Sequence, residues 1–439
     1  MSGLETGLFG FAVLFVLLAL RIPIGVAMLT VGTVGYVSIA GDKALLSYLK
    51  TETYWQFSTD TLSVVPLFLL MGQFAAKAGL SQALFRAAYT WLGHFRGGIA
   101  MASIGGCAGF GAISGSSLAT AATMGQVALP ELRRFNYSGA LATGTLAAGG
   151  TLGILIPPSI VLIIYAVMVE ANVATLFQAA LIPGILAALG YIAAIAIVVR
   201  INPEAGPAGE RATRAQKWSA LLEIWPVLAI FLLVMGGIYA GFFTPTEGAG
   251  VGAMGTFLIA VTRGGMRLRG FIDALLGTAQ FTAMIFLILL GAAIFNAFLG
   301  FSQLPIAAAD FFGNSGLPAY TILLGMVVLY IFLGTVMDSL SMIFLTVPIF
   351  WPIIAGLDFG MGPEETKLWF GIITLIVVEM GLITPPVGLN VFIINSMARD
   401  VPMIETFKGI IPFFISDIIR VVVLISFPFI TLVLPNLLN

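Results

Sequence analysis

The sequence predicts an all-α polytopic membrane protein made of two inverted repeats, each with a re-entrant hairpin and a broken helix. Three observations carry this prediction. Of the 439 residues, 59% are hydrophobic and only 9% are charged, and the mean hydropathy is +1.08, which is more apolar surface than a soluble core buries. Basic residues gather in a few loops. Two Pro-Pro pairs interrupt apolar runs at corresponding places in the two halves of the chain.

Composition also excludes several classes of function. The formal net charge of −1 argues against nucleic acid as a partner, because proteins that bind it present a strong positive field. The single cysteine, Cys107, excludes an internal disulfide and a cysteine metal cluster. The single histidine, His94, lies between Trp91 and Arg96, which is typical of a membrane interface rather than of a catalytic site.

The basic loops orient the spans, because Lys and Arg gather on the cytoplasmic side of membrane proteins. Arg96, Arg133 and the loops at residues 200–217 and 263–269 should therefore face the cytoplasm. Residues 356–367 carry three acids and one lysine and should lie on the opposite side.

Uncharged runs place the elements of each repeat. The first repeat, residues 1–216, should hold spans at 8–20, 24–40, 62–77 and 177–199, an arm near 45–57, a hairpin at 97–131 and a broken helix at 138–169. The second repeat, residues 217–439, should hold spans at 220–240, 248–261, 281–299 and 412–434, an arm near 268–279, a hairpin at 316–354 and a broken helix at 368–397.

The two hairpins follow from charge and glycine content. The uncharged run that starts at residue 97 has basic residues at both ends, so both ends lie on one side of the membrane. Its middle reads "GAISGSSLAT", which predicts a tip at residues 114–117. The run at 316–354 begins and ends near non-basic loops, and its middle reads "GTVMDSLS". This pattern predicts a second hairpin that enters from the other face, as in inverted-repeat transporters.

The two broken helices are predicted by "GILIPP" at residues 153–158 and "GLITPP" at residues 381–386. A proline inside a helix removes a donor and clashes with the carbonyl four residues earlier. Unpaired backbone in lipid survives only where protein or water satisfies it. The exposed carbonyls suit a hard cation such as sodium, and the N-terminal end of the second half-helix suits a carboxylate. A simple proline kink is the structural alternative.

The tips and breaks supply the candidate site residues. Candidate sodium ligands are Ser114, Gly115, Ser117, Gly153, Pro157, Thr335, Ser339, Gly381, Thr384 and Pro385. Candidate substrate-binding residues are Ser116, Ser159, Asp338 and Asn390.

Two acidic residues stand out in this apolar setting. An ionisable group at membrane depth is functional by default, so Asp338 is expected to hold a cation. The alternatives are that its tip emerges into water, or that Asp338 only caps the returning half-helix. Glu379, two residues before the second break, is either a coupling carboxylate or the partner of a neighbouring hydroxyl.

These motifs resemble those of a known family, the large membrane subunit of tripartite ATP-independent periplasmic (TRAP) transporters. The similar stretches are "GAISGSSLATAATMG", "GGTLGILIPPSIVLIIY", "LFQAALIPG" and "EMGLITPPVGLNVFIIN", and the likeness covers nearly the whole chain. The resemblance implies an elevator-type fold, in which a scaffold carries a mobile domain of hairpins and broken helices. It places sodium sites where tip 114–117 meets break 153–158 and where tip 335–341 meets break 381–386.

The resemblance also implies a cellular setting. It implies sodium-driven uptake of a small organic acid, delivered by a periplasmic substrate-binding protein, through the bacterial inner membrane. A small four-helix membrane subunit is expected as a separate chain, because the spans fill this one.

Three other functions remain open at this point. A stand-alone dicarboxylate or ion symporter of the same architecture would need no binding protein. A channel would also use a polar path through the membrane. An intramembrane serine protease would use Ser114, but "GAISG" is not a G-x-S-G motif and His94 is its only possible histidine base.

Overall fold

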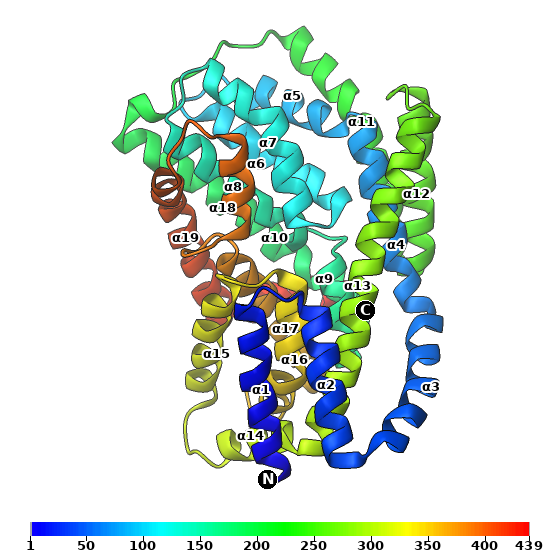
Figure 1. Ribbon diagram of the computed structural model, residues 1–439. Helices are drawn as coiled ribbons and strands as arrows, with labels where there is room; N and C mark the ends of the chain where they lie inside the picture. The colour runs from blue at the N-terminus through cyan, green and yellow to red at the C-terminus, as the bar shows by residue number, and fades with distance from the viewer. Residues whose placement is uncertain (1, 439) are drawn as a thin grey trace.

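The computed structural model describes residues 2–438, and throughout that range the ordered elements are helices (Figure 1). Four of the described helices, α10, α11, α13 and α19, are each long and apolar enough to cross a membrane alone. The pair α8 and α9 passes the same test as one span bent by 44°. The predicted all-α, multi-pass class is therefore confirmed.

The helices of the first half agree closely with the predicted ranges. They are α1 (Gly3–Ala19), α2 (Ile24–Ala40), α3 (Asp42–Ser58), α4 (Asp60–Lys77), α5 (Leu80–Leu92), α6 (Gly98–Ser114), α7 (Ser117–Arg134), α8 (Gly139–Leu155), α9 (Ile160–Val169) and α10 (Val173–Ile201), followed by the short 3-10 helix η1 (Pro203–Ala205). Helix α5 was not predicted. It is amphipathic, with Leu80, Leu84 and Phe85 buried on one side.

The second half contains the remaining helices. They are α11 (Arg214–Tyr239), α12 (Pro245–Thr262), α13 (Leu268–Ser302), α14 (Leu304–Gly313), α15 (Ala319–Gly334), α16 (Ser339–Ala355), α17 (Pro363–Gly381), α18 (Leu389–Met397), α19 (Met403–Ser426) and α20 (Phe429–Leu438). The proposed boundary between repeats, at residues 216 and 217, falls in the first turn of α11.

Two predictions for this half are wrong. The arm at 268–279 and the span at 281–299 form one continuous helix, α13, of 35 residues. No proline lies within it, so nothing breaks it, and at 1.5 Å per residue it is about 52 Å long. The last span, predicted at 412–434, is split, because Pro428 disfavours a helical Phe427 (φ −130°, ψ 72°).

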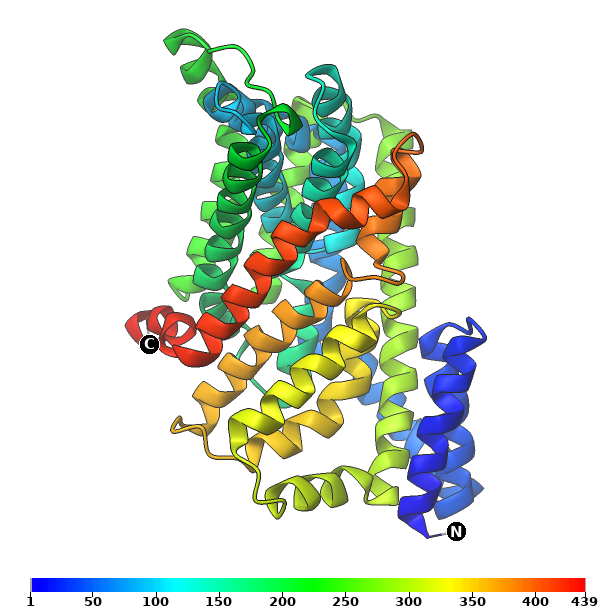
Figure 2. The same cartoon turned by 90° about the vertical axis from the view of Figure 1, so that its left-hand side faces the viewer.

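The two hairpins enter from opposite ends of the molecule. In Figure 1, α6 and α7 descend from the top and α15 and α16 rise from the bottom, so their tips approach near the middle. The basic loops predicted at residues 200–217 and 263–269 lie at the top. The segment between α16 and α17 lies at the bottom, as Figure 2 also shows. The basic and acidic loops thus occupy opposite ends.

Candidate functional site

The first hairpin tip touches the first helix break through backbone. Helix α6 ends at Ser114 and α7 begins at Ser117, with Gly115 in the left-handed region (φ +62°) between them. A Cβ on Gly153 would lie 2.5 Å from the carbonyl oxygen of Ser116 and 2.4 Å from Oγ1 of Thr120. A Cβ on Gly115 would lie 3.0 Å from the carbonyl oxygen of Pro158. The predicted meeting of this tip and this break is present in the structure.

The first break spans the four residues between α8 and α9. Its Pro157-Pro158 bond is cis, and the two prolines remove the intrahelical donors for the carbonyls of Gly153 and Ile154. Ser159 is fully buried, and its hydroxyl caps α9 by accepting a hydrogen bond from the Leu162 amide at 3.3 Å. The Ser159 side chain is therefore already used by the helix that it starts.

The second tip and break repeat this construction. A Cβ on Gly381 would lie 2.5 Å from Cα of Gly334, and the Gly388 amide donates to the Thr335 carbonyl at 3.4 Å. The break again holds a cis proline pair, Pro385-Pro386. The Thr384 hydroxyl donates to the carbonyl of Met380 at 2.6 Å, back into α17.

Asp338 caps the helix that follows the second tip. One of its carboxylate oxygens accepts a hydrogen bond from the Ser341 amide at 3.1 Å, and the other accepts from the Ser341 hydroxyl. The side chain is half-buried. Its capping function is thus visible directly, and cation binding by the same carboxylate stays a prediction.

A buried carboxylate, Glu379, lies between the two tips. It is 1% exposed, and its Oε1 accepts a hydrogen bond from the Ser339 hydroxyl at 2.6 Å. The Ser117 hydroxyl also faces this carboxyl group. Ser117 and Ser339 are the first residues of α7 and α16, so the two returning half-helices both present their N-terminal ends to Glu379. Of the two alternatives for Glu379, pairing with a hydroxyl is the one observed.

Asn390 connects the second break to the first half of the chain. It is fully buried, and its Nδ2 donates to the carbonyl of Ala147 in α8 at 3.3 Å. A Cβ on Gly150 would lie 3.1 Å from this Nδ2 and 3.2 Å from the carbonyl oxygen of Ser117. The structure therefore brings Asn390, which follows the second break in the sequence, beside the first tip.

A second buried polar network, between α19 and α10, was not predicted from the sequence. Asp417 and Arg420 on α19 are 1% and 7% exposed and form an ion pair of 2.8 Å. The Tyr191 hydroxyl donates to Asp417 at 2.9 Å and lies 3.0 Å from Oγ1 of Thr151 in α8. The sequence contained one sign of this network. Asp417 and Arg420 are three residues apart in an otherwise apolar span, so they lie on one helix face and can pair there.

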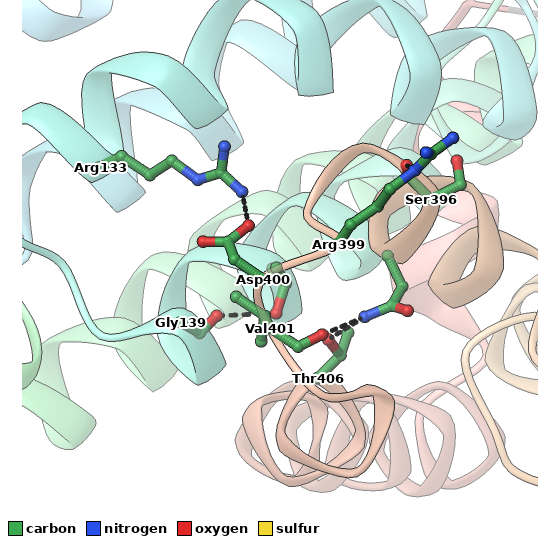
Figure 3. A network of polar contacts seen from close by, with 9 residues as sticks. Arg133, Gly139, Ser396, Arg399, Asp400, Val401 and Thr406 are labelled. Atoms are coloured by element: carbon green, nitrogen blue, oxygen red, sulfur yellow. Dashed lines mark hydrogen bonds and ion pairs between the residues drawn. The ribbon is translucent and has the colours of Figure 1, made fainter.

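At the end of the molecule with the basic loops, the two halves meet in a further contact (Figure 3). The Arg133 guanidinium points to the Asp400 carboxylate and forms an ion pair with it. The Asn395 amide donates to the carbonyl of Val401 at 2.8 Å, and the Val401 side chain fills the space where a Cβ on Gly139 would lie, 2.8 Å away. The end of the first hairpin, the start of α8 and the segment after α18 are thus held together.

Comparison with known proteins agrees with this architecture. Residues 11–430 match the model of the tripartite ATP-independent periplasmic transporter, DctM component. The chain belongs to this family. A C4-dicarboxylate TRAP transporter large permease protein, DctM, from Pseudomonas aeruginosa is 36% identical over 86% of this chain and 87% of its own length.

Two further proteins resemble this chain, one over part of a longer sequence and one in its solved structure. The isethionate TRAP transporter permease protein DctMQ of Oleidesulfovibrio alaskensis is 31% identical over 89% of this chain but only 60% of its own length. Among solved structures, the YdaH transporter of Alcanivorax borkumensis superposes with a TM-score of 0.61 at 16% identity, covering 88% of this chain and 89% of that one. That likeness concerns the fold.

Proposed function

We propose that this chain is a sodium-coupled carrier that imports a small organic acid across the bacterial inner membrane. The observation that carries the proposal is the pair of tip-and-break contacts, at Gly153 with Ser116 and at Gly381 with Gly334. Each contact puts a hairpin tip that carries hydroxyl groups against the helix end before a proline pair. In the first break the prolines remove the intrahelical donors for the carbonyls of Gly153 and Ile154, whereas in the second the Gly381 carbonyl accepts from the Thr384 amide at 3.0 Å. Hydroxyl and carbonyl oxygens are the ligands that a hard cation takes in broken-helix transporters.

The sodium ions would be held by the candidate ligands at these contacts. Ser114, Gly115 and Ser117 would act with Gly153 and Pro157 in the first site, and Thr335 and Ser339 with Gly381, Thr384 and Pro385 in the second. Bound sodium would supply positive charge at the tips and breaks, which themselves contain no lysine or arginine. The substrate acid would lie beside Ser116, Asp338 and Asn390, whereas the buried, capping Ser159 fits a supporting role for α9.

The partners follow from the family and from the relatives. A periplasmic binding protein would deliver the substrate, and a small four-helix membrane subunit would associate as a separate chain. The length of the DctMQ relative beyond the matched part supports such a second membrane component. Transport by an elevator movement of the hairpin domain belongs to the same proposal. A stand-alone symporter of this architecture is the alternative.

Reconstitution tests the proposal. The chain, its small partner subunit and the binding protein would be combined in proteoliposomes with an inward sodium gradient. We expect uptake of radiolabelled succinate, N-acetylneuraminate or pyruvate that needs all three proteins and stops when potassium replaces sodium. Uptake without the binding protein would favour the stand-alone symporter, and uptake that ignores sodium would disprove the coupling.

Serine substitutions at the first tip test the sodium site itself. Ser114→Ala and Ser117→Ala each remove a buried neutral ligand, which costs about 1–3 kcal/mol, so the half-saturating sodium concentration should rise about 5- to 150-fold. Ser103→Ala is the control, because Ser103 is equally buried on α6 but bonds only to the carbonyl of Ile99. An equal effect in all three variants would remove the tip from the sodium site.

A further inference from the structure

The space between α4 and the first hairpin contains a small cavity of about 100 Å³, lined mostly by apolar side chains and by a few polar ones. One wall comes from α4, with Gln73 and Gly72, and the other from the hairpin, with Ser116 and Thr123. Phe281 of α13 closes one side. Helix α4 packs mainly along α12 and α13, so the two walls belong to different packing units of the molecule.

The polar groups around this cavity are available for binding. Within residues 2–438, neither Gln73 nor Thr123 forms a side-chain hydrogen bond, although both are half-buried. The Ser116 oxygen accepts from the Ala119 amide at 3.4 Å, which leaves its hydroxyl proton free to donate. Two half-buried side chains without a hydrogen bond, and a third with a spare hydroxyl proton, leave hydrogen-bonding groups in this cavity for a ligand or water.

The chemistry of the lining selects the ligand. The Gln73 amide and the hydroxyls of Ser116 and Thr123 can each donate a hydrogen bond to a ligand, and no charged side chain lines the cavity. Ser116 is the N-cap residue of α7 and Thr123 lies in the second turn of the same helix, and both line the cavity. Donors without a fixed charge, next to the first tip, fit a carboxylate whose countercharge is a sodium ion at that tip.

We propose that this cavity binds the acidic group of the transported substrate, and that Gln73 is a specificity-determining contact supplied by the opposite packing unit. The proposal rests on the proposed function above. Because a Cβ on Gly72 would lie only 3.1 Å from Cα of Ser114, α4 and the tip are in close contact here. Separation of the hairpin from α4 would take Gln73 away from the substrate, so Gln73 contributes to binding only in this arrangement.

The test compares substrate dependence with sodium dependence. Gln73→Ala and Thr123→Val would be measured in the complete complex in proteoliposomes, with whichever of succinate, N-acetylneuraminate and pyruvate the unmodified protein takes up best. We expect the half-saturating substrate concentration to rise about tenfold in each variant, with the half-saturating sodium concentration unchanged. Gln280→Ala is the matched control, since Gln280 is exposed on α13 beside Phe281.

A second readout keeps the test independent of turnover. In Gln73→Cys, addition of the same acid with sodium should slow maleimide labelling, and the acid with potassium should not. Substrate affinity in Gln73→Ala equal to that of the Gln280→Ala control, or a parallel change in sodium affinity, would overturn the assignment while leaving sodium-driven uptake intact. Absence of any sodium-driven uptake in the unmodified complex would instead overturn the proposed function, and this inference with it.

Discussion

At the scale of single residues, the site depends on glycines that let two backbones touch. Gly153 and Gly381 precede the two proline pairs by four residues, and each packs against the hairpin tip of its own half at a distance that leaves no room for a side chain. The backbone of both glycines is ordinary helix, which any residue can adopt. Glycine is therefore needed at these positions only because a side chain would not fit. This gives the glycine in each "GxxxPP" pattern a physical reason that the pattern itself does not reveal.

Gly381→Ala should destabilise the protein and abolish transport. Its Cβ would lie 2.5 Å from Cα of Gly334, and such overpacking costs about 1–3 kcal/mol. Gly325→Ala in α15 is the control, because a Cβ there meets nothing within 4 Å and alanine favours a helix by about 1 kcal/mol. Thermal unfolding of the purified protein in detergent distinguishes them, and equal melting temperatures would contradict the close contact.

Asp338 allows its two possible functions to be separated. Asparagine caps a helix nearly as well as aspartate, whereas alanine costs about 1 kcal/mol. We expect Asp338→Asn to keep the melting temperature but to lose most sodium-driven uptake, and Asp338→Ala to lose both. Normal, sodium-dependent uptake by the asparagine variant would show that the carboxylate serves only as the cap seen at Ser341.

At the scale of helices, α19 has two faces of opposite character. Ile415, Ile419 and Val422 are more than half exposed on the outer face, as expected for a helix that borders lipid. Asp417 and Arg420 point inward to Tyr191. Figure 2 shows α19 running obliquely across the outside of the molecule. A buried ion pair of this kind fixes which face of the helix turns inward.

Replacing both residues of this ion pair should destabilise the protein less than replacing either residue alone. Asp417→Leu or Arg420→Met alone leaves a buried charge without its partner, which costs about 3–5 kcal/mol, whereas an apolar pair removes both charges. We therefore expect the double variant to melt at a higher temperature than either single variant. A double variant that loses as much stability as the two single variants combined would mean that the ion pair makes no direct contribution.

At the scale of the whole molecule, the charged loops predict the orientation in the membrane. The basic segments lie at one end and the acidic segment before α17 at the other. Cys107 is the only cysteine and is fully buried, so it should give little background in labelling. An impermeant maleimide added outside the cell should modify Glu364→Cys and spare Lys217→Cys and Arg133→Cys. The reverse pattern would invert the topology.

The sequence predicts the helices and breaks better than the contacts around them. The ends of α2 and both breaks could be read from local features, because proline, glycine and charge act within a few residues. The continuity of α13 was missed, since no local feature distinguishes a long helix from an arm joined to a span. Helix α5 was missed because it carries polar residues among its apolar ones.

The candidate site shows the same limit. The tips and breaks were identifiable, and so was the isolated acid Glu379. Its position between Ser117 and Ser339 could not be predicted, because one partner is 40 residues away along the chain and the other lies in the opposite half. The same holds for Tyr191 with Asp417, which are 226 residues apart. Such pairs depend on how the two halves interlock, which no short pattern encodes.

The hydrogen bond between Ala147 and Asn390 has a consequence for synthesis of the protein. Its two residues are 243 positions apart, so at 5–20 residues per second α8 leaves the ribosome roughly 12 to 50 seconds before α18. Every residue of α8 from Leu141 to Leu155 is buried in the finished protein. Helices α6, α7 and α10 of the same half already cover part of α8. The nascent first half must therefore wait in the membrane with the face of α8 that meets α18 and α19 exposed, until the second half arrives.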